Sequence, residues 1–445
     1  MIFARIALLP SGWAENVRVS GSAGRITEIV AQTHPHPDDT RVDALIPGMP
    51  NVHSHAFQRG HSGLTEMRGA GQESFWTWRE MMYRFALSVS PEDVSALAEM
   101  AYVEMLEAGF TRVGEFHYLH HDPSGAPYDN PAELSERIFD AAETTGIALT
   151  HLPVFYAHGG FGPKPAGEGQ RRFLHDIDAF IALIERCDKR ITRPQDRVGF
   201  APHSLRAASH EDLTALTAAL PGRRLHIHIS EQVKEVEDCL DHHGQRPVEW
   251  LLDNFDVGAD WCLIHATHLT ERETARLAAC GAVAGLCPVT EANLGDGLFP
   301  APDFLNAGGR IAIGTDSNVR IDVAEELRVL EYGQRLTKRA RNVLAEEGGS
   351  TGRRLLDAAL AGGAQALDAP SPEIAVDAPA DLVSLSDPLD LAPNGDNLID
   401  RWVFGRDVDV DHVWAAGEHV VQHGRHVRRD AVQHRFGEVL RRVLV

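Results

Sequence analysis

Residues 224–268 read RLHIHISEQVKEVEDCLDHHGQRPVEWLLDNFDVGADWCLIHATH. Two short β-like runs, 224–231 and 261–268, stand at the ends of this stretch, and a longer segment rich in charged residues separates them. A strand, a long connection and a second strand are typical of a βα unit in a parallel sheet. The first run carries His226 and His228, and the second carries His265 and His268.

The same alternation recurs along the chain between residues 44 and 317. Stretches with helical spacing lie between several of the β-like runs, such as 91–109 and 131–146, each of which opens with Pro and ends at Gly. Eight runs with helical returns predict a closed TIM (β/α)8 barrel. The eight candidate strands are 44–55, 111–118, 148–156, 197–204, 224–231, 261–268, 282–291 and 310–317.

The two flanks of the chain have a different pattern, with short alternating strands and turn residues. Examples are RVSGSAGRITEIV (18–30) and ADLVSLSD (380–387). We expect residues 1–47 and 374–445 to form one small β-sandwich domain beside a barrel of residues 48–373. The last residues, DAVQHRFGEVLRRVLV (430–445), predict a terminal helix.

The charge balance excludes several kinds of partner. Lys and Arg number 42 against 64 Asp and Glu, which gives a net charge of −22 at pH 7. This surface repels nucleic acids and anionic membranes, so we expect neither as a partner. An anionic small substrate would need arginines of its own at the site.

Cysteine usage and hydropathy indicate the compartment. The five cysteines form no CxxC pair and are an odd number, unlike a disulfide framework. The apolar start of the chain soon meets Pro and Gly and has no cleavage motif of a signal peptide. No apolar stretch reaches the roughly 18 residues of a membrane span. We therefore expect a cytoplasmic protein.

Ligand-type side chains gather at the ends of the predicted strands. His53 and His55 are two residues apart, so both imidazoles point to the same side of a strand and could grip one ion. His226 and His228 repeat this spacing, and Glu231 follows three residues later, where the strand opens into a loop. A single HxH pair is weak evidence for a metal site.

Two further strand ends strengthen the interpretation. The run 261–268 contains His265, and the run 310–317 contains Asp316. Taken alone, a buried histidine usually pairs with a backbone carbonyl, and an aspartate in this position could cap the following helix. Four strand ends that carry such residues at one barrel mouth would be an improbable coincidence. The pattern predicts a catalytic site for Zn²⁺, with Fe²⁺ as the alternative.

At these residues the sequence resembles the amidohydrolase superfamily, in which HxH follows strand 1, His ends strands 5 and 6, and Asp ends strand 8. Longer strings are similar to the branch that hydrolyses N-formimino-L-glutamate to N-formyl-L-glutamate and ammonia in bacterial histidine degradation. These strings are PGMPNVHSHAFQRG (47–60), SFWTWREMMYR (74–84), GEFHYLHHD (114–122), HIHISEQ (226–232), HATH (265–268) and TEANLGDG (290–297).

The resemblance implies a site with one metal ion, because the strand 197–204 has no Lys that could bridge two ions. It also implies that a metal-activated hydroxide attacks the formimino carbon. The residues that it implies are His53, His55, His228 and Asp316 as metal ligands, and Glu231, His265 and Asp316 as the catalytic groups.

The substrate of this branch carries two carboxylates. Arg206 lies two residues past Ser204, at the end of the fourth strand, in a position to bind a carboxylate with both arms of its guanidinium. The resemblance adds Gln58, Arg79, Tyr118 and His203 as substrate contacts and suggests a homodimer. We expect Arg79 in a long loop within reach of a neighbouring subunit, and an ordinary surface or aromatic-stacked arginine is the alternative.

Two other functions remain open at this stage. The same ligands would serve a deaminase of a nucleobase or nucleoside, such as guanine or an adenosine derivative, and only the pocket residues distinguish the two substrates. A non-catalytic barrel that acts as a binding protein is the second alternative. Such a protein would be expected to lack some of the ligands.

Overall fold

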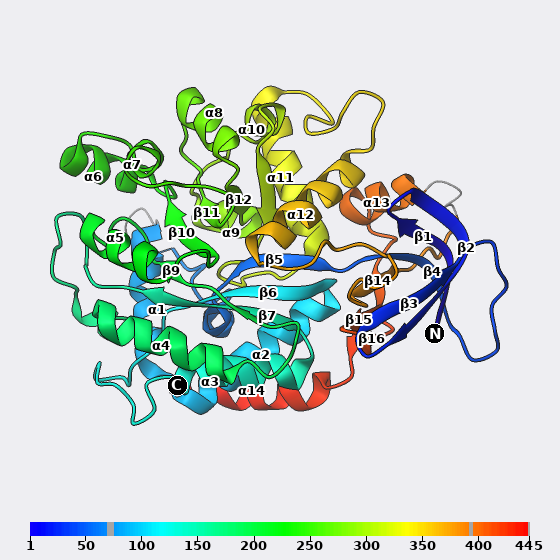
Figure 1. The fold of residues 1–445 in the computed structure, drawn as a ribbon, viewed down its shortest axis with the longest axis horizontal. Coiled ribbons are helices and arrows are strands. Elements are labelled where there is room, and N and C mark those ends of the chain that lie inside the picture. The colour runs from blue at the N-terminus through cyan, green and yellow to red at the C-terminus, as the bar shows by residue number, and fades with distance from the viewer. Residues whose placement is uncertain (69–74, 391–394, 444–445) are drawn as a thin grey trace.

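A barrel of parallel strands surrounded by helices forms the centre of the protein (Figure 1). The computed structural model describes residues 1–68, 75–390 and 395–443. The barrel strands are β5 (Met49–Ser54), β6 (Phe110–His117), β7 (Ala148–Phe155), β8 (Arg197–Val198) with β9 (Ala201–Pro202), β10 (Leu225–Ile229), β11 (Trp261–His265), β12 (Val283–Leu286) and β13 (Arg310–Ile313).

The strands pair in two parallel sheets, one of β5 to β9 and one of β10 to β13. Parallel bridges join the sheets at both seams, from Ser54 to Asp316 and from Ser204 to His228. At the first seam, the His55 N–H donates to the Asp316 carbonyl at 2.9 Å. The barrel is thereby closed, and the predicted (β/α)8 architecture is confirmed.

Several predicted strands differ in extent from the observed ones. The run 44–55 contains two strands, β4 (Thr40–Pro47) of the small domain and β5 of the barrel. Gly48 lies between them, and a Cβ there would lie only 2.2 Å from Thr111 Oγ1, so the chain passes at a point where only glycine fits. The run 282–291 is strand only to Leu286, because a helix begins at Pro288.

Helices and two short 3-10 turns fill the connections. α2 begins as the sequence predicts, with Pro91 in its first turn and the Ser90 hydroxyl accepting a hydrogen bond from Asp93 N. The helices are α1 (Phe75–Ser88), α2 (Pro91–Glu107), α3 (Glu133–Thr145), α4 (Ile177–Arg190), α5 (His210–Ala219), α6 (Val233–His243), α7 (Pro247–Asn254), α8 (Glu271–Cys280), α9 (Pro288–Leu294), α10 (Ala301–Asn306), α11 (Val323–Lys338), α12 (Thr351–Ala366), α13 (Gly395–Phe404) and α14 (Arg429–Val443), and the 3-10 turns are η1 (Ala56–His61) and η2 (Glu168–Gln170).

The segment after β5 corrects one expectation. Residues 75–80 were expected in a long loop, but they form the first turns of helix α1, while Ser74 lies outside the described residues. The helix buries Phe75, Met82, Phe85 and Ala86, whose spacing of seven, three and one residues is helical. The aromatic residues of this segment therefore form the face on which a helix packs. None of the helices in the described part of the chain combines the length and apolar character that crossing a bilayer requires.

The small domain unites the two ends of the chain, as expected. Its strands pair as one continuous sheet in the order β17-β16-β15-β14-β4-β1-β2-β3. β14 from the C-terminal part pairs antiparallel with β4, and β1 pairs parallel with the other edge of β4. The strands not yet given are β1 (Ile2–Leu9), β2 (Gly12–Ser22), β3 (Arg25–Val30), β14 (Leu382–Leu385), β15 (Val410–Ala415), β16 (Glu418–Gln422) and β17 (Arg425–His426).

The terminal helix α14 lies against helix α2 of the barrel (Figure 1). Arg429 forms an ion pair with Glu107 at 2.8 Å, and Arg435 pairs with Glu99. Val432, Phe436 and Val439 supply the buried apolar side of the helix. The chain therefore returns from the small sheet to cover the barrel.

Candidate active site

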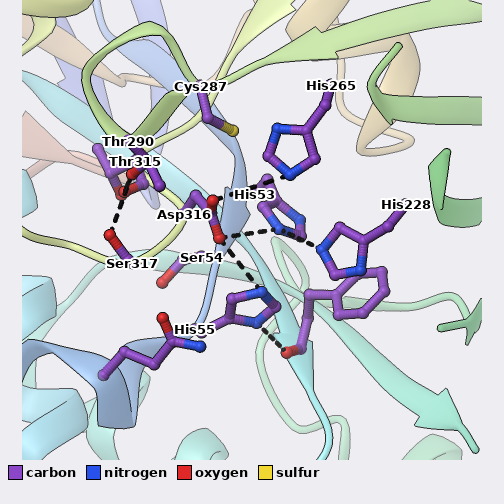
Figure 2. A network of polar contacts seen from close by, with 12 residues as sticks. His53, Ser54, His55, His228, His265, Cys287, Thr290, Thr315, Asp316 and Ser317 are labelled. Carbon is purple, nitrogen blue, oxygen red and sulfur yellow. Dashed lines mark hydrogen bonds and ion pairs between the residues drawn. The ribbon is translucent and has the colours of Figure 1, made fainter. Parts of the chain in front are cut away.

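Four buried groups converge at the mouth of the barrel: His53 and His55 from the end of β5, His228 from β10, and Asp316 just after β13 (Figure 2). One ligand atom of each lies within 4.8 Å of the others. Asp316 Oδ1 is 3.4 Å from His53 Nε2 and 3.2 Å from His55 Nε2. His228 Nε2 lies 3.0 Å from His53 Nε2. The structure thus brings together the four predicted metal ligands.

Hydrogen bonds and burial prepare these imidazoles to bind a cation. His55 Nδ1 donates to the Phe116 carbonyl at 2.9 Å, and His228 Nδ1 donates to the His203 carbonyl at 3.1 Å. Each ring therefore presents an unprotonated Nε2 toward the common point. Burial lowers the pKa of His55 to about 3 and the pKa values of His53 and His228 well below their ordinary value. Three neutral imidazoles and a carboxylate are a donor set that fits a divalent transition metal.

A polar network across the barrel seam holds these strand ends. The Asn51 side-chain amide donates to Thr315 Oγ1 at 2.7 Å, and the Thr315 hydroxyl donates to Asn318 Oδ1 at 2.6 Å. Asn318 in turn donates to Ser54 Oγ and to the His55 carbonyl. Asn51 is separated from Thr315 by 264 residues, so this network ties the HxH segment to the segment of Asp316.

Strained backbone marks the same strand ends. His265 and Asp316 have φ values of +69° and +44°, and Ser230 has +51°. Such values cost free energy in residues other than glycine and are typical of functional sites. Asp316 does not cap the next helix, because the N-cap of α11 is Asp322. That structural alternative for Asp316 is therefore wrong.

The predicted acid and base groups lie beside the metal-ligating cluster. His265 Nε2 is 3.8 Å from Asp316 Oδ2 and 4.0 Å from Glu231 Oε1. Burial raises the pKa of the Glu231 carboxyl to about 7. Burial alone would lower the pKa of His265, but the carboxylates of Glu231, Glu291 and Asp316 outweigh it and raise this pKa to about 10. A protonated carboxyl near neutral pH is what a general acid requires.

A cavity opens from this cluster toward solvent, and both predicted arginines line it. Arg79 comes from α1 of the same chain, and Arg206 follows β9. Their guanidinium carbons lie 4.6 Å and 5.9 Å from the ring centroid of Trp76. Arg79 is therefore stacked on an aromatic ring, as the alternative expected, and is also part of the cavity wall. In the described part of the chain, Nε of each arginine is buried without a hydrogen-bond partner.

The other predicted substrate contacts line the same cavity. Gln58 donates from its side-chain amide to the Tyr118 hydroxyl at 2.5 Å, while the buried Gln58 Oε1 has no partner among the described residues. His203 lies edge-on to Tyr156, with a ring-centroid distance of 4.7 Å. The cavity thus offers unsatisfied hydrogen-bonding groups beside two cations.

Sequence reasoning assigned no role to several residues of the site. Glu291 Oε1 accepts a hydrogen bond from His265 Nδ1 at 3.2 Å and another from Cys287 N at 2.9 Å. The expected alternative partner of His265, a backbone carbonyl, is replaced by this carboxylate. Tyr156 and Phe173 also line the cavity. Glu291 lies in the string 290–297 that carried part of the resemblance, and this was the one signal in the sequence that pointed to it.

Residues 44–420, which include the whole barrel and the metal-ligating cluster, match the amidohydrolase family. The chain belongs to the amidohydrolase family. Its N-terminal residues 1–43 match a second family, described as formimidoylglutamate deiminase HutF, N-terminal domain. Both the barrel and the first part of the small domain are therefore those of known relatives.

Individual amidohydrolases show the same similarity. A formimidoylglutamate deiminase of Pseudomonas aeruginosa is 50% identical over 449 residues, which cover 100% of this chain and 99% of the relative. The crystal structure of an amidohydrolase from Brucella melitensis has a TM-score of 0.97 at 53% identity and covers 100% of this chain and 99% of its own. A 5-methylthioadenosine/S-adenosylhomocysteine deaminase of Natronomonas pharaonis is 29% identical, over 89% of this chain and 86% of its own length.

Proposed function

We propose that this amidohydrolase hydrolyses N-formimino-L-glutamate to N-formyl-L-glutamate and ammonia, a step of histidine degradation. The observation that carries the proposal is the pair of guanidinium groups, Arg79 and Arg206, in the same cavity as the metal-ligating cluster. A substrate with two carboxylates matches two cations in a chain whose net charge is −22. The identity of 50% with the deiminase of Pseudomonas aeruginosa supports the same activity.

In this proposal, His53, His55, His228 and Asp316 hold one divalent cation, Zn²⁺ in preference to Fe²⁺. The donor set of three imidazoles and one carboxylate suits either ion. A bound cation of this kind lowers the pKa of a coordinated water toward neutrality.

The residues around the cluster divide the proton transfers between them. Asp316 accepts the proton that the attacking water loses, and His265, held by Glu291, orients the water and stabilises the charge that develops during the attack. Glu231 donates its proton to the imino nitrogen during the attack. The resulting amine takes the proton held by Asp316 and leaves as ammonia, while the hydroxyl on the tetrahedral carbon returns a proton to Glu231 and becomes the formyl C=O. The pKa of Glu231 near 7 supports this role, because much of the carboxyl is protonated at neutral pH.

Substrate recognition is assigned to the cavity wall. Arg206 and Arg79 bind the two carboxylates, while Gln58, Tyr118 and His203 bind the remaining polar atoms. Each side chain lines the cavity, and the guanidinium Nε atoms are among the buried groups without a partner in the described residues. We also propose a cytoplasmic homodimer, on the grounds of the reduced cysteines and the resemblance to the branch.

An ammonia-release assay with N-formimino-L-glutamate tests the function. The purified protein should release ammonia, a chelator should abolish the release, and added Zn²⁺ should restore it. N-formyl-L-glutamate should be identified as the other product. Guanine and 5-methylthioadenosine, supplied at equal concentration, serve as competing substrates. Faster release of ammonia from either of them would overturn the proposal.

A further inference from the structure

A second group of potential metal ligands adjoins the first. His265, Cys287 and Asp316 are all buried, and one ligand atom of each lies within 4.8 Å of the others. Asp316 belongs to both groups. Its Oδ1 faces His53 and His55, whereas its Oδ2 faces His265 at 3.8 Å. In Figure 2, the Cys287 sulfur and the His265 ring lie on the side of Asp316 opposite His55.

One carboxylate holds two members of this second group in place. Glu291 Oε1 accepts the hydrogen bonds of both His265 Nδ1 and Cys287 N. Because Nδ1 donates to Glu291, Nε2 is the nitrogen of His265 that can bind a cation once it has given up its proton, and it lies 3.8 Å from Asp316 Oδ2. A carboxylate on the far nitrogen of a histidine is the usual support of an imidazole that binds a metal.

The donor set has a clear chemical preference. An imidazole nitrogen, a sulfur and a carboxylate oxygen suit Zn²⁺ and the softer Cd²⁺. Bonds of about 2.0–2.3 Å place the ligands of a tetrahedral zinc ion roughly 3.3–3.8 Å apart. The distance of 3.8 Å between His265 Nε2 and Asp316 Oδ2 is a few tenths of an ångström longer than the roughly 3.3–3.5 Å expected for a nitrogen and an oxygen ligand, so the two groups would have to approach slightly when the ion binds.

We propose that His265, Cys287 and Asp316 form a second cation site, which binds excess Zn²⁺ or other thiophilic divalent ions and inhibits the enzyme. When the ion binds, the Cys287 thiol and His265 Nε2 each lose a proton to solvent, and a sulfur–metal and a nitrogen–metal bond form. The inhibition rests on the proposed function, because the ion occupies His265 Nε2 and Asp316 Oδ2, which that mechanism uses. The binding itself does not depend on the reaction.

The alternative is that Cys287 has only a structural role, as a packed side chain of the apolar core. Its neighbours in the apolar cluster include Cys262, Val283 and Ala312. Cys262 is equally buried and belongs to neither group of ligands. Cys262→Ala is therefore a matched control for the removal of Cys287.

Cadmium titration of the zinc-loaded protein tests the site. We expect one Cd²⁺ per chain to bind with the ultraviolet charge-transfer absorption of a cadmium–thiolate bond, while metal analysis shows that one zinc per chain is retained. Ammonia release should fall in proportion to that absorption. Cys287→Ala and Cys287→Ser should keep their basal activity and need at least about 100-fold more Cd²⁺ for either effect, because a lost supporting residue alone costs about 10–100-fold in metal affinity.

Two controls separate this site from other binding. Cys262→Ala should titrate like the wild type, and so should His423→Ala, since Asp411, His412 and His423 form a further group of potential ligands in the small domain. The proposal fails if the wild type shows no cadmium–thiolate absorption, if both Cys287 variants keep it at the same Cd²⁺ concentration, or if the absorption appears without loss of activity. If the protein released no ammonia from N-formimino-L-glutamate, the proposed function would be refuted. The cadmium–thiolate absorption would still show whether Cd²⁺ binds at Cys287.

Discussion

Replacement of Arg206 by alanine is the sharpest test of the proposed substrate. Arg206 is 9% exposed, so its interaction with a carboxylate would take place largely out of water. Truncation of one partner of a buried, hydrogen-bonded charge pair costs about 2–5 kcal/mol, and hydrogen bonds to charged groups contribute about 1.5–3 kcal/mol each. For two such bonds we expect a loss of about 3–5 kcal/mol, which lowers kcat/KM roughly 100- to 4,000-fold.

The assay compares kcat/KM of wild type, Arg206→Ala and Arg206→Lys for three substrates. These are N-formimino-L-glutamate, its side-chain amide N-formimino-L-glutamine, and N-formimino-4-aminobutyrate, which lacks the α-carboxylate. Wild type should discriminate against whichever analogue lacks the carboxylate that Arg206 binds, and Arg206→Ala should have lost that discrimination. Arg206→Lys keeps the positive charge but lacks the two parallel N–H donors of the guanidinium. Its kcat/KM for N-formimino-L-glutamate should therefore lie between those of the wild type and Arg206→Ala.

The expected losses are meaningful only if the barrel is intact. Metal content and thermal unfolding of Arg206→Ala should equal those of the wild type, because Arg206 is not among the groups that converge on the cation. If Arg206→Ala retained the kcat/KM of the wild type for N-formimino-L-glutamate, Arg206 would have no part in binding the substrate. The argument from two arginines in one cavity would then fail.

Three further predictions concern the acid and the packing of the barrel. Glu231→Gln should keep its metal but lose about 10²–10⁴-fold in kcat, and an unchanged kcat would refute the role of Glu231 as general acid. Because the acid must be protonated, kcat of the wild type should fall tenfold per pH unit above the pKa of Glu231, which is about 7. In stopped assays from pH 6 to 9, the residual kcat of Glu231→Gln should not change with pH. Gly362→Ala would place a Cβ 2.0 Å from the Ile311 carbonyl oxygen. This clash should lower the free energy of unfolding, measured by urea titration, by about 1–3 kcal/mol. An unchanged unfolding midpoint would mean that helix α12 can move away from Ile311.

The barrel could be predicted because its signals are local. Alternation of strand-like and helix-like runs needs only a few residues at a time, and the spacing of His53 and His55 places both rings on one side of a strand. The ends of parallel strands meet at one mouth in any barrel, so convergence of His228 and Asp316 with these rings followed from the topology.

Interactions between distant segments could not be predicted in the same way. The hydrogen bond from Asn51 to Thr315 exists because the barrel closes between its first and last strands, and no local pattern encodes that register. The role of Glu291 depends on the turn of α9, which carries its carboxylate back to His265. Residues 75–80 of helix α1 were expected in a loop, since their aromatic side chains have no strict period until one face is known to be buried.

The proposed metal ligands and the proposed carboxylate-binding residues come from different parts of the fold. The former stand on strand ends that backbone hydrogen bonds and the Asn51–Thr315–Asn318 network hold across the closed barrel. The arginines stand outside that frame, on helix α1 and after strand β9. Substitutions in the cavity wall can therefore change the substrate without moving the cation. A relative that is 29% identical is named a 5-methylthioadenosine/S-adenosylhomocysteine deaminase, which is the kind of change in substrate that this division would allow.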